Sequence, residues 1–251
     1  MPQPDPADAT EPRRFRDKPV SFVRRSGRMS DGQERAWAEL APRYVLPVER
    51  DAAATSIRPG TTIDPHTEFG RAAPLVVEIG SGQGHAIVHA AASAPGTDFL
   101  AVEVFRAGLA RTMLDADRVG AGNLRLVEAN APEVLEHLLP DASVDELWIF
   151  FPDPWHKKKH TKRRLVAPEF PPLAARALRD GGLLRLATDW EDYALQMRGV
   201  FAGAADFAPA FEGEWAPRFE GRVMTAFERK GIAKGREIRD LVYRRADRTG
   251  V

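Results

Sequence analysis

Residues 76–84 read VVEIGSGQG, an apolar run that enters a turn with glycine at every second position. The residues that follow, 85–94, have the composition of a helix that stops at Pro95 and Gly96. Glycines between a strand and a helix let the backbone turn sharply and approach a ligand closely, and the helix N-terminus offers free N–H groups. The stretch therefore predicts an α/β fold with a ligand site at this turn.

Strand and helix patterns alternate along the rest of the chain. Apolar strand-like runs occur at residues 75–79, 99–104, 124–127, 144–151 and 183–188, and helical patterns at residues 105–119, 132–139, 169–178 and 189–201. This alternation predicts right-handed βαβ units and a parallel sheet covered by helices on both faces. The segment 237–245, EIRDLVYRR, alternates like a strand after a connection with few helix signals, so we expect it to pair antiparallel as the last strand.

Composition excludes several kinds of site. The 251 residues carry 36 basic and 36 acidic side chains and include no cysteine, which rules out disulfides, thiolate zinc sites and a cysteine nucleophile. The six histidines lack paired spacing with acids, so no metal is expected. No apolar run approaches the roughly 20 residues that span a bilayer, and residues 1–12 do not resemble a signal peptide. We therefore expect a cytoplasmic protein with no membrane partner.

Residues 1–45 are predicted to form a flexible basic N-terminal arm, followed by a single domain at residues 46–251. The segment 13–28 is rich in arginine and lysine and holds one acid, with Phe15 and Phe22 among the cations. Such a run is either a solvated tail or an arm that contacts phosphates and docks through its aromatic side chains. Inside this arm, residues 31–41 have helical spacing, with Asp31 as the expected N-cap.

Polar side chains mark the ends of the first three predicted strands. The glycine spacing is G-x-G-x-G rather than the dinucleotide G-x-G-x-x-G, and Glu78 stands two residues before the first glycine. A carboxylate there repels a pyrophosphate but attracts a sulfonium cation that carries an amino group, which favours S-adenosylmethionine. Glu103 is placed to accept the two ribose hydroxyl protons. Asn130 either accepts the adenine amino proton or caps a helix.

Residues 150–164, FFPDPWHKKKHTKRR, leave the fourth predicted strand at the end where open α/β sheets bind ligands. Pro152 and Pro154 restrict the backbone around Asp153, which holds its carboxylate in place. Trp155 offers an aromatic plane for a nucleic-acid base. The acid-free run of cations that follows is either a solvated loop or a phosphate-binding stripe beside the cofactor, and its density in a neutral chain favours the stripe.

These stretches resemble the bacterial tRNA (guanine-N7)-methyltransferase family, which has a class I S-adenosylmethionine-dependent fold. The resemblance extends from Phe22 to Arg245 and is carried by SFVRRSGRMS, VVEIGSGQG, AVEV, FPDPWHKKKHTKRR, LATDW and TAFERKG. It implies a Rossmann-like, mostly parallel seven-stranded sheet with the last strand antiparallel. It also implies methyl transfer from S-adenosylmethionine to N7 of a guanine in the variable loop of tRNA, with S-adenosylhomocysteine as product and no obligatory protein partner.

The resemblance implies roles for individual residues as well. Cofactor contacts fall on Glu78, Gly80, Gly82, Gly84, Glu103, Asn130 and Asp153, of which Asp153 is also the implied catalytic acid. Substrate contacts fall on Lys157, Asp189, Thr225, Ala226, Phe227 and Glu228, and RNA contacts on Lys159, His160, Thr161, Lys162, Arg163 and Arg164. Two positions depart from the family pattern, because Asn130 stands where Asp is common and Ala226 where Lys is frequent.

Some of these residues also have the spacing of helix caps. Asp189 stands at a predicted helix start, where Asp is a favoured N-cap, and Thr225 with Glu228 has the spacing of a capping box. Rival functions are a methyltransferase for another RNA base atom, for a small molecule or for a protein, and a non-catalytic RNA-binding module. The intact glycine-rich turn and its acids argue against the last of these.

Overall fold

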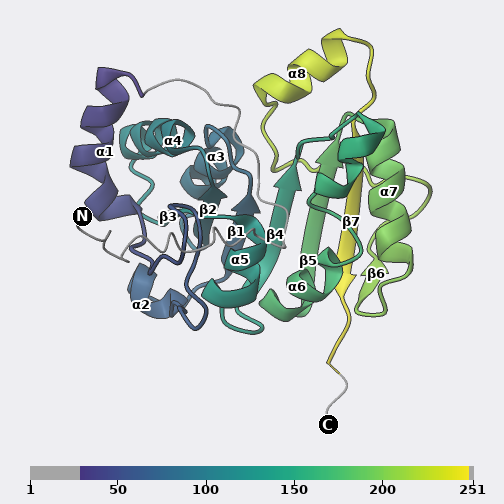
Figure 1. Cartoon of the computed structure of the whole chain (residues 1–251), viewed down its shortest axis with the longest axis horizontal. Coiled ribbons are helices and arrows are strands. Elements are labelled where there is room, and N and C mark those ends of the chain that lie inside the picture. The colour runs from purple at the N-terminus through teal and green to yellow at the C-terminus, as the bar shows by residue number, and fades with distance from the viewer. Residues whose placement is uncertain (1–28, 249–251) are drawn as a thin grey trace, which may run out of the picture.

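A computed structural model describes residues 29–248 and contains one seven-stranded sheet of order β3-β2-β1-β4-β5-β7-β6 (Figure 1). Strands β1 to β5 pair in parallel, and β7 runs antiparallel to both β5 and β6. The strands are β1 Leu75–Ile79, β2 Asp98–Glu103, β3 Leu124–Glu128, β4 Val144–Phe150, β5 Leu178–Thr188, β6 Phe207–Pro209 and β7 Arg239–Arg245. The predicted α/β class, with a mostly parallel sheet and an antiparallel last strand, is confirmed.

Helices cover both faces of the sheet. Val76 of β1 belongs to the same buried cluster as Ile87 and Met113, which come from α3 His85–Ser93 and α4 Arg106–Val119. Val77 points to the opposite face and is clustered with Ala174 of α6 Phe170–Ala177. The other helices are α1 Asp31–Tyr44, α2 Pro65–Phe69, α5 Ala131–Glu133, α7 Glu191–Ala202 and α8 Ala226–Ala233, with a π-helical turn Val134–Leu138 and a 3-10 turn Lys158–Arg163.

Two details of the sheet differ from the sequence prediction. Strand β6 was not predicted, because three residues are too few to show an alternating pattern. Strand β5 starts at Leu178 rather than at residue 183, so Gly181 and Gly182 lie inside the strand instead of ending a helix. The φ of Gly181 is +73°, and the pairing of β4 with β5 shifts register at this point, so the glycines mark a local irregularity.

The N-terminal part of the described chain is packed on the domain. Tyr44 at the end of α1 is fully buried, and the Gln33 side chain donates to the Ala107 carbonyl of α4 at 3.1 Å. The predicted N-cap, Asp31, is wrong: Ser30 caps α1, since its hydroxyl accepts from the Gln33 N–H and the Gln33 side chain accepts from the Ser30 N–H. The prediction of a flexible basic arm stays a prediction for residues 1–28, which lie outside the described residues.

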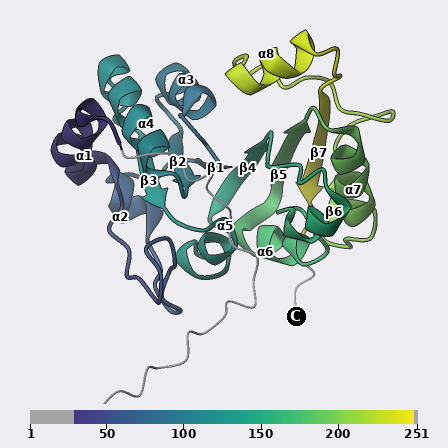
Figure 2. The same cartoon turned by 45° about the horizontal axis from the view of Figure 1, so that its top comes forward.

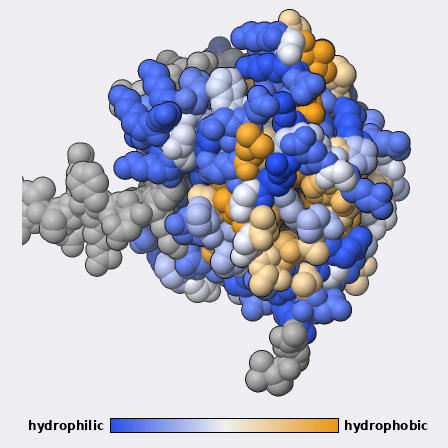
Figure 3. All heavy atoms as spheres, turned by 90° about the vertical axis from the view of Figure 1, so that its right-hand side faces the viewer, coloured by the Kyte–Doolittle hydropathy of each residue, from blue (hydrophilic) through white to orange (hydrophobic). Residues whose placement is uncertain are grey.

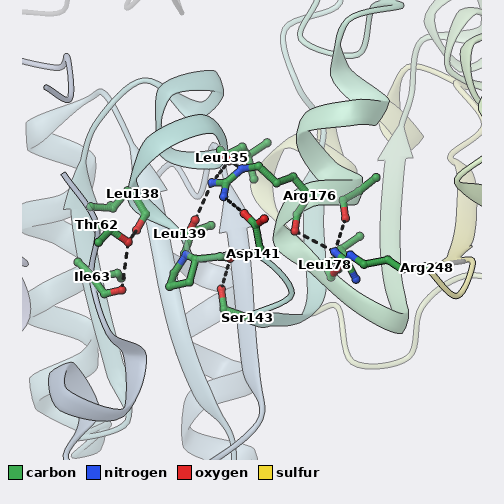
Figure 4. A network of polar contacts seen from close by, with 12 residues as sticks. Thr62, Ile63, Leu135, Leu138, Leu139, Asp141, Ser143, Arg176, Leu178 and Arg248 are labelled. Carbon is green, nitrogen blue, oxygen red and sulfur yellow. Dashed lines mark hydrogen bonds and ion pairs between the residues drawn. The ribbon is translucent and has the colours of Figure 1, made fainter. Parts of the chain in front are cut away.

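Two arginines tie together the base of the sheet, where β4 and β5 begin (Figure 4). Arg176 of α6 donates to the Leu135 and Leu139 carbonyls at 2.6 Å and pairs with Asp141. Arg248, beyond β7, donates to the Leu178 carbonyl at 2.9 Å and to the carbonyls that end α6. Arginine side chains thus satisfy main-chain oxygens that the helix and the π-helical turn leave without an intrahelical partner.

Helix α8 stands apart from the helices that cover the sheet. Figures 1 and 2 both show it above the C-terminal ends of β4 and β5, on the end of the molecule opposite to the arginines of Figure 4. Figure 3 shows the side of the molecule around α7, where apolar side chains gather below the middle of the face. Within residues 29–248, no helix is both long and apolar enough to cross a membrane.

Candidate active site

The glycine-rich turn after β1 needs its glycines for two separate reasons. Gly80, Gly82 and Gly84 have φ values of +72°, +59° and +76°, a region that side-chain-bearing residues rarely adopt. A Cβ on Gly84 would also lie 2.4 Å from Thr112 of α4. Gly108 of α4 likewise has no room for a side chain, because a Cβ there would lie 2.2 Å from the Gly82 carbonyl oxygen. The turn is therefore pressed against α4.

Glu78 presents a buried carboxyl oxygen at this turn. Its side chain is 4% exposed, and Oε2 has no hydrogen-bond partner within residues 29–248. Burial, with the nearby charge of Glu103 adding to it, raises the pKa of Glu78 to about 8. A buried acceptor without a partner, carried by a group with a shifted pKa, is typical of a position that a ligand completes.

Glu103 holds the turn in place from the end of β2. Its Oε2 accepts from the Gly82 N–H at 2.8 Å, and its Oε1 accepts from the N–H groups of Val104 and Phe105 at 2.7 and 2.9 Å. Burial raises the pKa of Glu103, and the charge of Asp153 adds to the shift. The charge of Glu103 therefore acts on Glu78 and that of Asp153 acts on Glu103, and the structure brings the three predicted acids to one end of the sheet.

Asn130 is buried at the end of β3. It occupies the N-cap position of α5, which is one of its two expected roles, although its side chain makes no capping hydrogen bond there. Its Nδ2 instead donates to Glu133 Oε1 at 3.4 Å. A second carboxylate at this position would face Glu133, which gives a physical reason for an amide rather than an acid here.

The loop after β4 is bracketed by two residues with an uncommon backbone. Phe151 and Trp155 have φ values of +53° and +43°, and bulky residues reach this left-handed region only under strain. Asp153 lies exposed between them. The Trp155 ring packs against side chains of the basic run that follows it. The His160 ring lies edge-on to it, with 5.8 Å between the ring centres, and the Arg163 guanidinium carbon lies 5.2 Å from the centre of the Trp155 ring.

The basic run divides into exposed cations and one buried arginine. The 3-10 turn Lys158–Arg163 lies at the surface, where the Thr161 hydroxyl donates to the Lys158 carbonyl at 2.9 Å. His160 is partly covered, and burial followed by the charge of Arg163 lowers its pKa, so the ring is neutral near neutral pH. No ion pair within the described residues involves a lysine of this run, whose lysines are Lys157, Lys158, Lys159 and Lys162.

Arg164 does not fit the prediction of an RNA contact. Its side chain is 2% exposed, its Nε donates to the Pro154 carbonyl at 2.7 Å, and it pairs with Asp192 at 2.6 Å. A further hydrogen bond goes to Gln196 at 2.7 Å. All of these partners belong to the protein, so Arg164 holds the proline-flanked loop instead of facing a phosphate.

Apart from Lys157 in the loop after β4, the predicted substrate residues cluster around α8. Asp189 at the end of β5 pairs with Arg236 at 2.8 Å, and it is not a helix cap, because the N-cap of α7 is Trp190. Thr225 caps α8 by accepting the Glu228 N–H at 3.1 Å, which confirms half of the capping box. Phe227 is 69% exposed, and only the backbone of Ala226 is described.

Glu228 does not make the second hydrogen bond of a capping box. Its carboxylate does not reach back to Thr225 but pairs with Arg218 at 2.8 Å and with Arg222 at 3.2 Å. The side chain is 1% exposed. Neither arginine was identified from the sequence, because nothing in their spacing distinguishes them from surface arginines.

Known proteins similar to this chain are methyltransferases. Residues 72–241 match a family described as "Putative methyltransferase". The tRNA (guanine-N(7)-)-methyltransferase of Paenarthrobacter aurescens (strain TC1) is 43% identical, over 91% of this chain and 92% of that protein. The proteins of the same name from Cutibacterium acnes and Methylococcus capsulatus are 46% and 41% identical, over 93% and 95% of this chain and 86% and 97% of theirs. The chain belongs to the tRNA (guanine-N(7)-)-methyltransferase family.

A solved structure agrees with the methyltransferase fold of this family. The 16S rRNA methyltransferase KamB superposes with a TM-score of 0.53 over 79% of this chain and 100% of that chain. The sequence identity is 16%, so the likeness concerns the fold alone. Within this member of the tRNA (guanine-N(7)-)-methyltransferase family, the glycine-rich turn, the loop after β4 and α8 all lie at the C-terminal end of the parallel strands, where α/β sheets bind ligands.

Proposed function

We propose that this chain transfers the methyl group of S-adenosylmethionine to N7 of a guanine in tRNA, in the variable loop. The observation that carries the proposal is the loop after β4, which places Asp153 and a run of lysines without ion pairs to other described residues beside the glycine-rich turn. These two segments are neighbours because β4 pairs directly with β1. Relatives named tRNA (guanine-N(7)-)-methyltransferase, 41–46% identical, support the same reaction. The proposal includes a cytoplasmic location, where tRNA is found.

The residues around the turn fit S-adenosylmethionine. The partnerless Oε2 of buried Glu78 is suited to an amino group. The Glu103 carboxylate is fixed by three N–H donors and retains acceptor capacity for ribose hydroxyls. Asn130, buried at the end of β3, is placed to meet the adenine. When bound, the cofactor supplies an electrophilic methyl group on a sulfonium sulfur.

Catalysis by this chain consists of positioning and electrostatics. Guanine N7 carries a lone pair and no proton, so no residue has to act as a general base. Asp153 sits on a loop whose backbone is fixed by two prolines and by the hydrogen bond from Arg164 to Pro154. Its carboxylate stabilises the positive charge that the purine acquires during alkylation.

The substrate side is formed by Asp189, α8 and the lysine run. Arg236 fixes Asp189 at the end of β5, where its carboxylate suits the N1–H and N2–H donors of guanine. The exposed ring of Phe227 offers a stacking surface for a base. The lysines of the loop neutralise phosphates, which predicts a binding constant that falls steeply with salt.

The decisive test combines methylation with site-specific cleavage. The purified protein is incubated with labelled S-adenosylmethionine and unmodified bulk tRNA, and the RNA is then treated with borohydride and aniline, which cleave at 7-methylguanosine. Cleavage at one guanine in the variable loop is the expected result. Incorporated label without cleavage would move the methyl group to another base atom. Cofactor binding without incorporation into tRNA would favour a small-molecule or protein substrate.

A further inference from the structure

Arg222 is a fully buried cation that the proposed reaction does not use. Its guanidinium pairs with both carboxylate oxygens of Asp240 on β7 and donates to Glu228 Oε1 at 3.2 Å. Arg218 donates to the same Glu228 oxygen at 2.8 Å and to the Arg222 carbonyl at 2.7 Å. These four residues, here called the Arg222 cluster, balance two positive against two negative side chains.

The Arg222 cluster also touches the loop that carries Asp153. The Arg222 guanidinium carbon lies 5.2 Å from the centre of the Phe150 ring and 5.5 Å from that of Phe151. Phe150 ends β4, and Phe151 has the strained φ of +53°. Because Phe151 is two residues before Asp153, the conformation that Arg222 packs against sets the direction in which the loop leaves the sheet.

The Glu228 carboxylate has little capacity left to accept hydrogen bonds from a substrate. Both of its carboxylate oxygens accept from Arg218, and one of them also accepts from Arg222. Burial disfavours its charged form, but the hydrogen bonds from the two arginines outweigh burial and hold the pKa of Glu228 below its usual value. The carboxylate is therefore ionised, paired inside the protein and 1% exposed.

We propose that Arg222 is a positioning residue that sets the spacing between the catalytic loop and α8. It packs on Phe151 on one side and holds α8 through Glu228 on the other. Glu228 then acts on the catalytic loop through Arg222, and it does not contact the guanine. This inference rests on the proposed role of the Asp153 loop.

The test compares two buried arginines, Arg222 beside the active site and Arg245 at the base of the sheet. Arg222→Lys keeps a charge but loses the planar contacts, whereas Arg245→Met removes an arginine that lies at the other end of β7 and donates to the Ala175 carbonyl at 3.1 Å. We expect Arg222→Lys to lower kcat by about 10- to 100-fold and to change the Kd of S-adenosylhomocysteine by less than about threefold. Arg245→Met should lower Tm and leave kcat of the folded protein unchanged.

Two results would overturn the positioning role. One is a kcat for Arg222→Lys within about twofold of wild type, measured below Tm. The other is an equal loss of kcat in both variants, which would mean general destabilisation. If Arg222→Lys does not fold, Asp240→Asn perturbs the same guanidinium more mildly and is expected to lower kcat in the same direction. An unchanged kcat in folded Asp240→Asn would count against the inference.

A double-mutant cycle tests the role of Glu228. If Glu228 acts through Arg222, the double variant Arg222→Lys/Glu228→Gln loses no more kcat than the stronger single variant. If Glu228 contacts guanine instead, the kcat losses of the two single variants multiply in the double variant, and Glu228→Gln alone raises the KM for tRNA. Either result would refute the claim that Glu228 acts through Arg222. Wild type in the same assay distinguishes failure of the proposed function from failure of the positioning role of Arg222. An inactive wild type refutes the proposed function, whereas an active wild type with an unaffected Arg222→Lys refutes only this inference.

Discussion

The two ends of the sheet use their cations differently. At the base, Arg176 and Arg248 donate to main-chain carbonyls (Figure 4), and they also pair with Asp141 and Asp180, respectively. At the C-terminal end, the lysines of the 157–162 segment make no ion pair with another described residue, although Arg164 beside them is buried and fully engaged. Cations that complete the backbone belong to the fold, whereas cations without a partner are available to phosphates. The position of a cation in space, and not its charge, separates these roles.

The largest expected effect compares one aspartate from each end. Asp153→Asn at the C-terminal end should lower kcat by about 100- to 1000-fold, because it removes the charge that faces the developing purine cation. Asp141→Asn at the base should leave kcat unchanged and lower Tm by about 2–4 °C, since Arg176 keeps its carbonyl partners. Single-turnover methylation at saturating tRNA and cofactor measures the difference. A kcat for Asp153→Asn within about threefold of wild type would contradict the assignment.

The next effect concerns tRNA affinity. Replacing Lys158, Lys159 and Lys162 by Gln should raise the Kd for tRNA by about 10- to 100-fold at low salt and reduce the slope of log affinity against log salt by about two to three. The matched control replaces three base arginines, Arg179, Arg244 and Arg248, and removes the same charge. Filter binding over a salt series distinguishes the two triples. Equal losses in both would mean that net charge alone governs binding.

A smaller effect is that the contributions of acids at the two ends of the sheet to folding stability depend on pH with opposite sign. Burial and Glu103 raise the pKa of Glu78 to about 8, so ligand-free stability from Glu78 is present at low pH and is lost as pH rises from its ordinary 4.5 toward 8. At the base, hydrogen bonds to Arg248 lower the pKa of Asp180, so its contribution is lost as pH falls through the folded value.

Ligand binding gives the measurement for Glu78. An amino group needs the ionised carboxylate, so affinity for S-adenosylhomocysteine should fall by up to about tenfold for each pH unit below about 8. Calorimetric titration of wild type and Glu78→Gln over this range tests the prediction. The variant should bind more weakly and lose the dependence, and an unchanged slope in Glu78→Gln would assign the proton to another group.

The smallest expected effect is at Asn130. Asn130→Asp places a second carboxylate beside Glu133, whose Oε1 is 3.4 Å from the amide nitrogen, and should lower stability by about 1 kcal/mol. The double variant Asn130→Asp/Glu133→Gln relieves the repulsion and should recover most of the loss. Thermal unfolding of the three proteins checks both statements. A single variant as stable as wild type would show that the two side chains move apart.

Local sequence patterns were sufficient to predict the framework of the active site. The apolar runs, the glycine spacing and the acids at strand ends depend on residues close together in the chain, so VVEIGSGQG placed Glu78 and its turn where the structure has them. The same reasoning placed Asp153 beyond β4. Pairing of β1 with β4 then follows from parallel topology.

Features that depend on distant contacts were not predictable. Arg164 belongs to the basic run by sequence, yet Asp192 and Gln196, from a helix many residues later, bury it. Gly108 looks like any helix glycine until the Gly82 carbonyl is seen against it. The Arg222 cluster joins residues whose pairing requires α8 and β7 to meet, and no local propensity encodes that meeting.

The attachment of α8 has a consequence for dynamics. The helix is fastened by ion pairs, those of Glu228 and the Asp189–Arg236 pair next to it, while Phe227 and Ile232 remain 69% and 49% exposed. Little apolar surface opposes its detachment, so α8 forms a unit whose local opening costs less free energy than unfolding of the sheet. Amide hydrogens of α8 should exchange with solvent well before those of β1 and β4.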